Sequence, residues 1–143
     1  VDNPEIKHFF GKVTMYLDFH KLGRDYILGF FKHFFPDKEE LVIPIKPLEL
    51  HYNINDFSNE ISNLEFKDAF RTLSQKNKEL GANVPPLIGA YMNLSASMKS
   101  FGTALNQKFG DVEETGILIS IDDIYANKKE RHISTYKKVE NGN

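Results

Sequence analysis

The stretch that decides the fold covers residues 83–120, NVPPLIGAYMNLSASMKSFGTALNQKFGDVEETGILIS. Pro85 and Pro86 are placed to begin a helix, because the N–H groups that they lack would be unpaired in a first turn. We expect that helix to run to about Ser97 and to be followed by a strand in SFGTALNQ, residues 100–107. The run TGILISIDDI, residues 115–124, is almost continuously apolar, which is typical of a central strand buried on both faces. The stretch therefore predicts a helix followed by two strands.

A further strand is predicted near the beginning of the sequence, in FFGKVTMYLDF, residues 9–19. Val13, Met15 and Leu17 point to one side, while Lys12 points to the other, and this period of two indicates a half-buried strand. The residues that follow switch to helical spacing. A strand followed by an amphipathic helix is half of a β-α-β unit.

Two longer helices are predicted from apolar residues that recur every three or four positions. The first lies in HKLGRDYILGFFKHFFP, residues 20–36, and Pro36 ends it. Lys21 and Asp25 lie one turn apart on the side that we expect to be exposed, where they would form a weak supporting pair. The second covers residues 65–80, with Gly81 as its C-terminal stop. The stripe residues are Leu22, Tyr26, Phe30 and Phe34 in the first helix, and Phe66, Phe70, Leu73, Asn77 and Leu80 in the second.

The middle of the sequence, residues 37–62, has no clear period. Pro44 and Pro47 break any helix there, and LELHYNI, residues 48–54, is consistent with a short strand. This mixture of helices and strands predicts an α/β or α+β domain. We expect an ordered core of about residues 5–126 and a polar tail, residues 127–143, that frays.

Composition narrows the classes of function. The sequence has 143 residues, a formal net charge of −2 and no cysteine. A nucleic-acid binder needs a basic surface, so this charge balance argues against one. The lack of cysteine excludes a disulfide framework, a zinc ribbon and a thiol nucleophile. Because no apolar run reaches the roughly 20 residues of a membrane-spanning helix, neither a span nor an export signal is predicted.

The sequence carries no recognised catalytic or metal-binding motif. Its five histidines lack the spacing of metal ligands, and acidic residues such as those of DVEE, Asp122 and Asp123 are typical of a solvated rim beside a strand. We therefore predict no metal site. Tyr91 is the hydroxyl-bearing aromatic residue of the deciding stretch, and core packing competes there with a contact to substrate. From the residues alone, the chain is an α+β fragment without a self-sufficient active site.

Two segments resemble a known family. VPPLIGAYMNLSASMKSFGTALNQKFGDVEETGILISI, residues 84–121, is similar to the PPLL-x-x-Y ending of a group of bacterial proteins long labelled hemolysins. HFFGKVTMYLDFHKLGRDYILGFFKHFFPD, residues 8–37, resembles that family's central strand of the form G-x-V-[ST] and the helix after it. These proteins are GNAT-type N-acyltransferases related to the enzymes that begin ornithine-lipid and glycine-lipid synthesis. The resemblance covers about residues 3–133 and is closest to the Bacteroidetes branch.

The resemblance implies a fold and a reaction. The family fold is a mixed, twisted sheet flanked by helices, in which two central strands splay apart to hold the thioester arm of the donor. This chain would be the incomplete C-terminal half of such a GNAT-like domain, with one splayed strand around residues 11–17. The donor substrate would be acyl-ACP, that is, an acyl group on acyl carrier protein, or acyl-CoA. The acceptor would be the α-amine of glycine or ornithine, and no tightly bound cofactor is implied.

The matched motif supplies candidate residues for the acyl or amino-acid pocket. Pro85 and Pro86 are expected to fix the start of their helix, and Tyr91 to face the pocket. Phe101 and Gly102 belong to the same motif, and Gly102 would let a backbone or ligand approach closely. The family's phosphopantetheine loop, [QR]-x-x-G-x-[GA], is absent from this sequence, so we expect the fragment alone to be inactive. No residue is assigned as a catalytic base.

Three hypotheses about function stay open at this point. The first is part of an acyl-ACP-dependent amino-acid N-acyltransferase that forms a lyso-aminolipid. The second keeps the fold but transfers an acetyl group from acetyl-CoA to a small amine. The third is a non-catalytic membrane-binding or dimerisation module that makes its contact through the Phe-rich helix, residues 20–35. We expect a cytoplasmic location, with a peripheral contact at the inner membrane and a dimer as further options.

Overall fold

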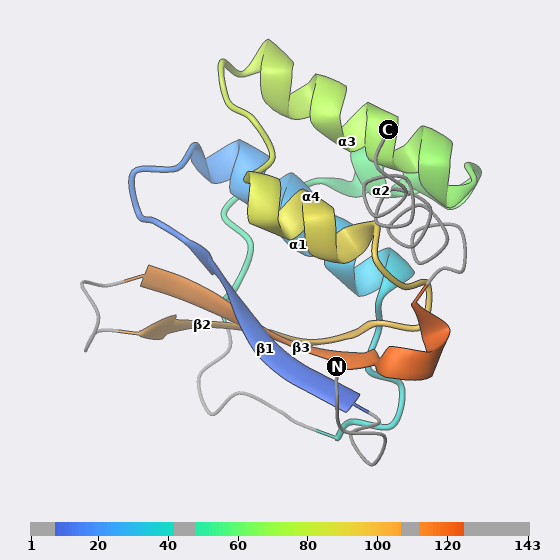
Figure 1. Ribbon diagram of the computed structural model, residues 1–143. Coiled ribbons are helices and arrows are strands. Elements are labelled where there is room, and N and C mark those ends of the chain that lie inside the picture. Colours follow the sequence, from blue (N-terminus) through green and yellow to red (C-terminus); the bar gives the residue numbers. More distant parts are fainter. Residues whose placement is uncertain (1–7, 42–47, 107–111, 125–143) are drawn as a thin grey trace, which may run out of the picture.

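The computed structural model describes residues 8–41, 48–106 and 112–124. The four described helices lie together on one face of a three-stranded sheet (Figure 1). The α+β class is therefore confirmed. The predicted tail, residues 127–143, lies outside the described residues. In chain order the elements are β1 (His8–Met15), α1 (Lys21–Phe34), α2 (Asn55–Ser62), α3 (Phe66–Glu79), α4 (Pro86–Met92), β2 (Lys99–Asn106), β3 (Val112–Ser120) and the 3-10 turn η2 (Ile121–Asp123).

The sheet has the strand order β1-β3-β2, so β3 is its central strand, as the apolar run predicts. Both pairs are antiparallel: β1 runs along β3 from His8 opposite Ser120 to Met15 opposite Glu113, and β2 lies on the other side of β3. A β-α-β unit joins two parallel strands of one sheet through a crossover helix. Because both strand pairs are antiparallel, β1 and α1 do not complete such a unit within the described residues.

The two faces of β3 are covered to different degrees. Glu113, Thr115, Ile117 and Ile119 are buried on the face that packs against the helices, whereas the residues between them are half-buried. The prediction of full burial on both faces is therefore wrong for the second face. The reason is that all the described helices lie on the first one.

Helix α1 begins at a side-chain cap. The Nδ1 atom of His20 accepts hydrogen bonds from the backbone N–H groups of Leu22 and Gly23, at 3.2 and 3.5 Å. These are two of the donors that a helix start leaves unpaired. Because β1 ends at Met15, the predicted inward position of Leu17 is wrong: this residue lies in the turn before α1 and is 42% exposed.

The segment predicted as a short strand, residues 48–54, contains no strand. It makes one sheet-like contact, in which the backbone N–H of Leu48 donates to the carbonyl of Thr103 at 2.8 Å. The chain then enters α2, a helix that the sequence pattern did not reveal. Its eight residues bury only Phe57 and Ile61, and a single pair at i, i+4 is too short a pattern to recognise.

Helix α3 agrees with its predicted position, and α4 begins where predicted but ends earlier. Gly81 follows α3 with a φ of +73°, a backbone conformation that glycine adopts at low cost. Pro86 is the first residue of α4 and Pro85 its N-cap, which confirms that the double proline begins this helix. The helix ends at Met92 rather than near Ser97, and the side-chain Nδ2 of Asn93 donates to the carbonyl of Gly89 at 2.7 Å at that end.

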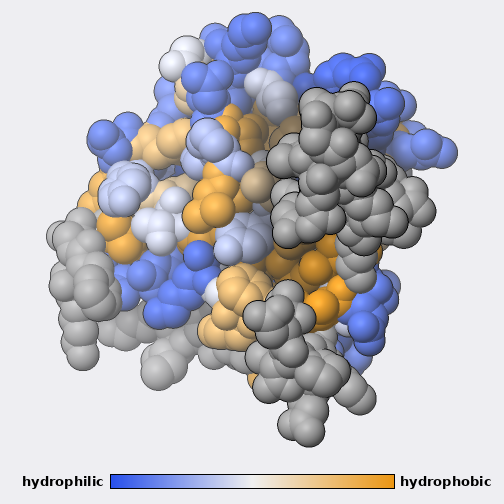
Figure 2. All heavy atoms as spheres, in the orientation of Figure 1, coloured by the Kyte–Doolittle hydropathy of each residue, from blue (hydrophilic) through white to orange (hydrophobic). Residues whose placement is uncertain are grey.

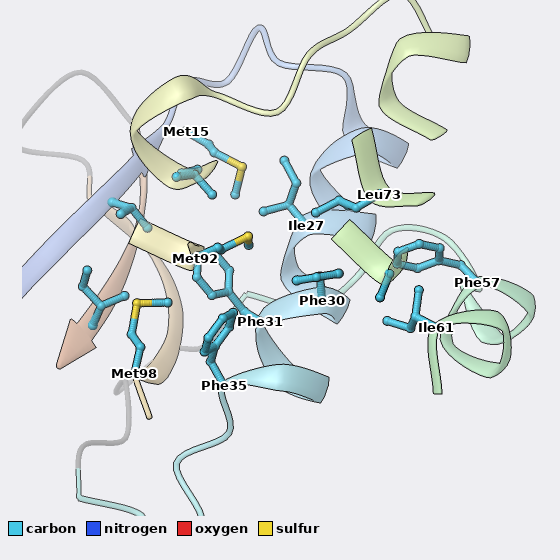
Figure 3. Packing of buried hydrophobic residues seen from close by; sticks show 14 of the residues in the cluster. Met15, Ile27, Phe30, Phe31, Phe35, Phe57, Ile61, Leu73, Met92 and Met98 are labelled. Atoms are coloured by element: carbon cyan, nitrogen blue, oxygen red, sulfur yellow. The ribbon is translucent and has the colours of Figure 1, made fainter. Parts of the chain in front are cut away.

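The core lies between the sheet and the helices and is rich in phenylalanine and methionine (Figure 3). Phe30 is fully buried on α1, and its ring meets that of Phe66 on α3 edge-on, with 5.7 Å between centroids. Phe31 and Phe35 extend the same face toward Met98. The Phe-rich helix therefore packs inward, and the hypothesis that it makes an intermolecular contact is wrong for these rings. No helix in the described ranges is both long and apolar enough to cross a bilayer.

Candidate functional site

A cavity of about 570 Å³ lies between the second half of α1 and the edge of the sheet formed by β2. Residues 48–50 form a third wall, and Thr115 of β3 reaches it from the centre of the sheet. Pockets that hold small molecules usually have volumes of about 300–1,000 Å³. The apolar residues of its lining are Leu28, Phe31, Pro36, Leu48, Leu50 and Phe101.

Two of the buried hydroxyl groups in the cavity lining, those of Thr103 and Thr115, are paired with each other. Thr103 and Thr115 lie opposite each other in the register of β2 and β3, and their Oγ1 atoms are 2.6 Å apart. One hydroxyl donates to the other, so the proton of the accepting hydroxyl is left for a further acceptor. Ser100 differs, since its hydroxyl donates to the carbonyl of Phe35 at 2.8 Å. The threonine pair can therefore donate one hydrogen bond to an oxygen inside the cavity.

Four charged residues line the cavity within the described part of the chain, and three of them are acidic. Lys32, Glu40 and Glu49 are exposed, and Asp37 is half-buried. Charges of one sign at the mouth of a low-dielectric cavity attract ligands of the opposite charge and repel ligands of the same charge. This rim favours neutral or positively charged groups over carboxylates and phosphates.

A buried ion cluster lies behind the wall formed by residues 48–50. Arg24, Asp25 and Glu113 have side-chain exposures of 2%, 0% and 3%. The guanidinium group of Arg24 donates to Asp25 Oδ1 through Nη2 at 2.8 Å and to Glu113 Oε1 through Nη1 at 2.8 Å. Nη2 also lies 3.4 Å from the carbonyl oxygen of Glu49, a lining residue. The cluster thus joins α1, β3 and one wall of the cavity.

Asp25 holds the neighbouring segment through its second oxygen. Its Oδ2 accepts hydrogen bonds from the backbone N–H groups of His51 and Tyr52, both at 2.8 Å. The predicted exposed pair of Lys21 and Asp25 is therefore wrong: Asp25 faces inward, and Lys21 Nζ instead lies 3.4 Å from Glu113 Oε1. The apolar residues of a helix indicate which of its faces is buried. They do not show that charged residues such as Arg24 and Asp25 are buried beside that face as an ion pair.

Charge balance keeps Arg24 protonated. Burial alone would lower its pKa, but hydrogen bonds and charge interactions with Asp25 and Glu113 outweigh burial and raise the pKa of Arg24 above its ordinary value. The prediction that the acidic residues of DVEE form a solvated rim is wrong for Glu113, which lies on the helix-facing side of β3.

The ion cluster is better suited to positioning than to proton transfer. Glu113 Oε2 is buried and has no hydrogen-bond partner, but Oε1 of the same carboxylate is bound to Arg24. A carboxylate that neutralises a buried guanidinium and is closed to solvent is a poor acceptor for a substrate proton. We infer that these residues fix the wall of the cavity, and we assign none of them as a catalytic base.

The five residues taken from the matched motif do not gather in one place. Phe101 and Gly102 line the cavity, whereas Tyr91 and Pro86 of α4 and its N-cap Pro85 do not. A pocket role for all five therefore stays a prediction. The structure does supply a reason for glycine at position 102, where φ is +88° beside an irregularity in the pairing of β2.

Tyr91 packs over the opposite edge of the sheet. Its ring stacks on that of Phe9 in β1, with 6.1 Å between centroids and 17° between planes. In Figure 2, hydrophobic patches lie among polar residues on the surface over α4 and β1, below the hydrophilic surface of α3. This region lies beside the edge of β1 that has no partner among the described strands. A second candidate region therefore exists, separate from the cavity at β2.

Metal chemistry has no support from side-chain clusters in the described ranges. No group of three or more His, Cys, Asp or Glu residues there could hold a metal ion. Asp123 accepts a hydrogen bond from the hydroxyl of Ser97 at 2.7 Å, so it serves to fix the turn after β3.

Comparison with known proteins finds two relatives over almost the whole chain. This chain is 50% identical over 133 residues to a glycine N(alpha)-acyltransferase of Bacteroides thetaiotaomicron, and 46% identical over 138 residues to one of Phocaeicola vulgatus. These matches cover 93% and 96% of the chain, which spans only 40% and 42% of the length of the two relatives. No protein-family model and no solved structure matches it.

Proposed function

We propose that this chain is part of an N-acyltransferase that transfers an acyl group to the α-amine of glycine. The observation that carries the proposal is the 46–50% identity, over 93–96% of the chain, to two proteins named as glycine N(alpha)-acyltransferases. Because the chain spans about two fifths of those relatives, the activity is proposed for the whole protein.

The position of β1 in the sheet supports this proposal. The resemblance predicts a GNAT-like sheet in which β1 is one of two central strands that diverge around the donor. In the structure, β1 is an edge strand among the described residues, and its free side can accept a further strand. The sequence contains no phosphopantetheine loop, so the donor site is proposed to lie elsewhere in the whole protein.

The proposed reaction is direct attack of a neutral amine on a thioester. A C–N bond forms between the amine and the acyl carbon, the C–S bond breaks, and the proton lost by the amine leaves with the thiolate or with a base. We propose acyl carrier protein as the carrier of the donor, and a lyso-aminolipid as the product. No cofactor takes part, and the reaction is proposed for the cytoplasm or the surface of the inner membrane.

The acetyl-CoA alternative differs from this proposal in the length of the acyl chain that the whole protein accepts.

Thiol release tests the proposed function. Full-length protein is mixed with dodecanoyl-acyl carrier protein and an amine, and free carrier-protein thiol is measured over time. We expect glycine to raise the rate well above the rate without amine, and N-acetylglycine, which has no free amine, to leave it unchanged. Ornithine and serine test the acceptor, and acetyl-CoA tests the donor. The proposal is wrong if no amine raises thiol release from the dodecanoyl donor.

A further inference from the structure

We propose that the cavity between α1 and β2 binds the acyl chain of a single-chain lipid with an uncharged head group, at a site separate from the edge of β1. The choice of an acyl chain rests on the proposed function, since an acyltransferase handles such chains. The position of the site rests on the structure alone. The proposal goes beyond the transfer reaction, because binding requires neither donor nor acceptor.

The lining gives the first reason. Leu28 and Phe31 of α1 line the cavity together with Leu48 and Leu50 from the segment before α2, so two of the segments that form it contribute apolar residues. Leu50 is 44% exposed. Covering such surface with an apolar ligand is favourable by roughly 25 cal/mol for each Å² removed from water. A hydrocarbon chain fits this lining better than a polar metabolite does.

The threonine pair gives the second reason. Thr103 and Thr115 can donate one hydroxyl proton into the cavity, and a buried donor without an acceptor is unfavourable. The carbonyl oxygen of an ester or amide supplies one acceptor without adding a charge. We therefore place the acyl carbonyl beside the threonine pair and the hydrocarbon chain against the leucines.

The rim gives the third reason, because it determines the charge of the head group. Among the described lining residues, the exposed carboxylates Glu40 and Glu49 outnumber the one exposed cation, Lys32. A fatty-acid carboxylate or a phosphate would be repelled by this arrangement, whereas a neutral head group would not. This preference also separates the site from one built to receive the phosphates of a pantetheine arm.

Position in the fold makes this site independent of the β1 edge. Strand β3 lies between β1 and β2, and buried side chains such as Val13 and Ile117 fill the space between the helices and the sheet. A chain in the cavity at β2 therefore does not occupy the region near Tyr91. The two regions can be occupied at the same time.

Calorimetric titration of the full-length protein tests the site directly. The probes are 1-dodecanoylglycerol, its octanoyl and decanoyl homologues, and dodecanoate, all below their micelle-forming concentrations. We expect each added pair of methylenes to strengthen binding by roughly tenfold until the cavity is full. Dodecanoate should bind at least about tenfold more weakly than 1-dodecanoylglycerol at low salt, and the gap should narrow as salt screens the rim.

Three tryptophan variants locate the binding site. Leu28→Trp and Leu50→Trp fill the cavity from its two walls, and Leu87→Trp is the matched control on α4, where the side chain is 58% exposed. We expect the first two to weaken binding of 1-dodecanoylglycerol by at least about tenfold, and the control to bind as the wild type does. Unchanged melting temperatures show that each variant is folded, and Leu50→Trp keeps the test decisive if Leu28→Trp unfolds.

A probe without a carbonyl tests the hydrogen bond. We expect the wild type to bind 1-dodecanoylglycerol several-fold more tightly than the ether 1-dodecylglycerol, and Thr103→Val to bind the two equally. The site assignment is overturned if both cavity variants bind 1-dodecanoylglycerol as tightly as the Leu87→Trp control. Thiol release can fail while this binding persists, which would refute the transferase and leave the lipid site. If the wild type releases thiol normally and the cavity variants bind 1-dodecanoylglycerol as the wild type does, the lipid site is refuted and the transferase proposal stands.

Discussion

The buried arginine offers the strongest test of the structural reasoning. Replacing Arg24 by leucine removes the only positive charge in contact with both Asp25 and Glu113 among the described residues, and it leaves two buried carboxylates. Removing one partner of a buried ion pair costs about 3–5 kcal/mol. Lys21 remains 3.4 Å from Glu113, so we expect the lower end, about 3 kcal/mol.

Urea unfolding at neutral pH measures this loss. The midpoint should fall while the dependence on urea stays constant, which shows that stability rather than compactness has changed. Arg71→Leu is the matched control, because Arg71 pairs with Asp68 on the surface with exposures of 72% and 58%. We expect a change within about 0.5 kcal/mol for the control.

A double-variant cycle tests the coupling within the cluster. Arg24→Leu combined with Glu113→Leu should cost less than the sum of the two single changes, because the double variant leaves one buried carboxylate in place of two. If Arg24→Leu destabilises the protein no more than Arg71→Leu does, the burial and pairing described for this cluster are wrong.

The protonation of Arg24 adds an expectation about pH. Its pKa is raised in the folded protein, so its stabilising charge is fully present below the ordinary pKa of arginine and is lost only as the pH rises through the raised value. Titration of Arg24 itself should therefore contribute no change in stability from about pH 6 to about pH 9. A loss of the Arg24 contribution within that range, measured against Arg24→Leu, would contradict this assignment.

Three further changes test other parts of the structure by the same unfolding assay. Phe30→Ala should lower the free energy of unfolding by about 3–5 kcal/mol because the ring is fully buried. Phe10→Ala should lower it far less, because that residue is 55% exposed. Equal losses would contradict the described core. Gly81→Ala should cost about 1–2 kcal/mol because φ is +73° and no neighbouring atom would clash, and a stabilised variant would refute this explanation. Thr115→Val should cost about 1–3 kcal/mol by depriving Thr103 of its buried partner, and a neutral result would show that water or another group replaces it.

Local sequence patterns identified most of the elements because each depends on neighbouring residues. The four-residue spacing that includes Phe30 predicts α1, the double proline predicts the start of α4, and the apolar run around Ile117 predicts the central strand. Helix α2 escaped detection because two buried residues in eight positions make no recognisable period. Strand alternation likewise predicts the inward face of β1 correctly but does not show that the strand ends at Met15.

The candidate site depended on contacts that no local pattern contains. Arg24 and Glu113 are separated by 89 positions, and their pairing follows from the register of β3 under the start of α1. The cavity likewise needs α1, residues 48–50 and β2 to meet, which placed Phe101 and Gly102 in its wall and left Tyr91 over β1. Periodicity alone determined which faces turn inward, because it is a property of consecutive residues. Only tertiary packing decided which inward faces meet, which charges are buried together and where space is left.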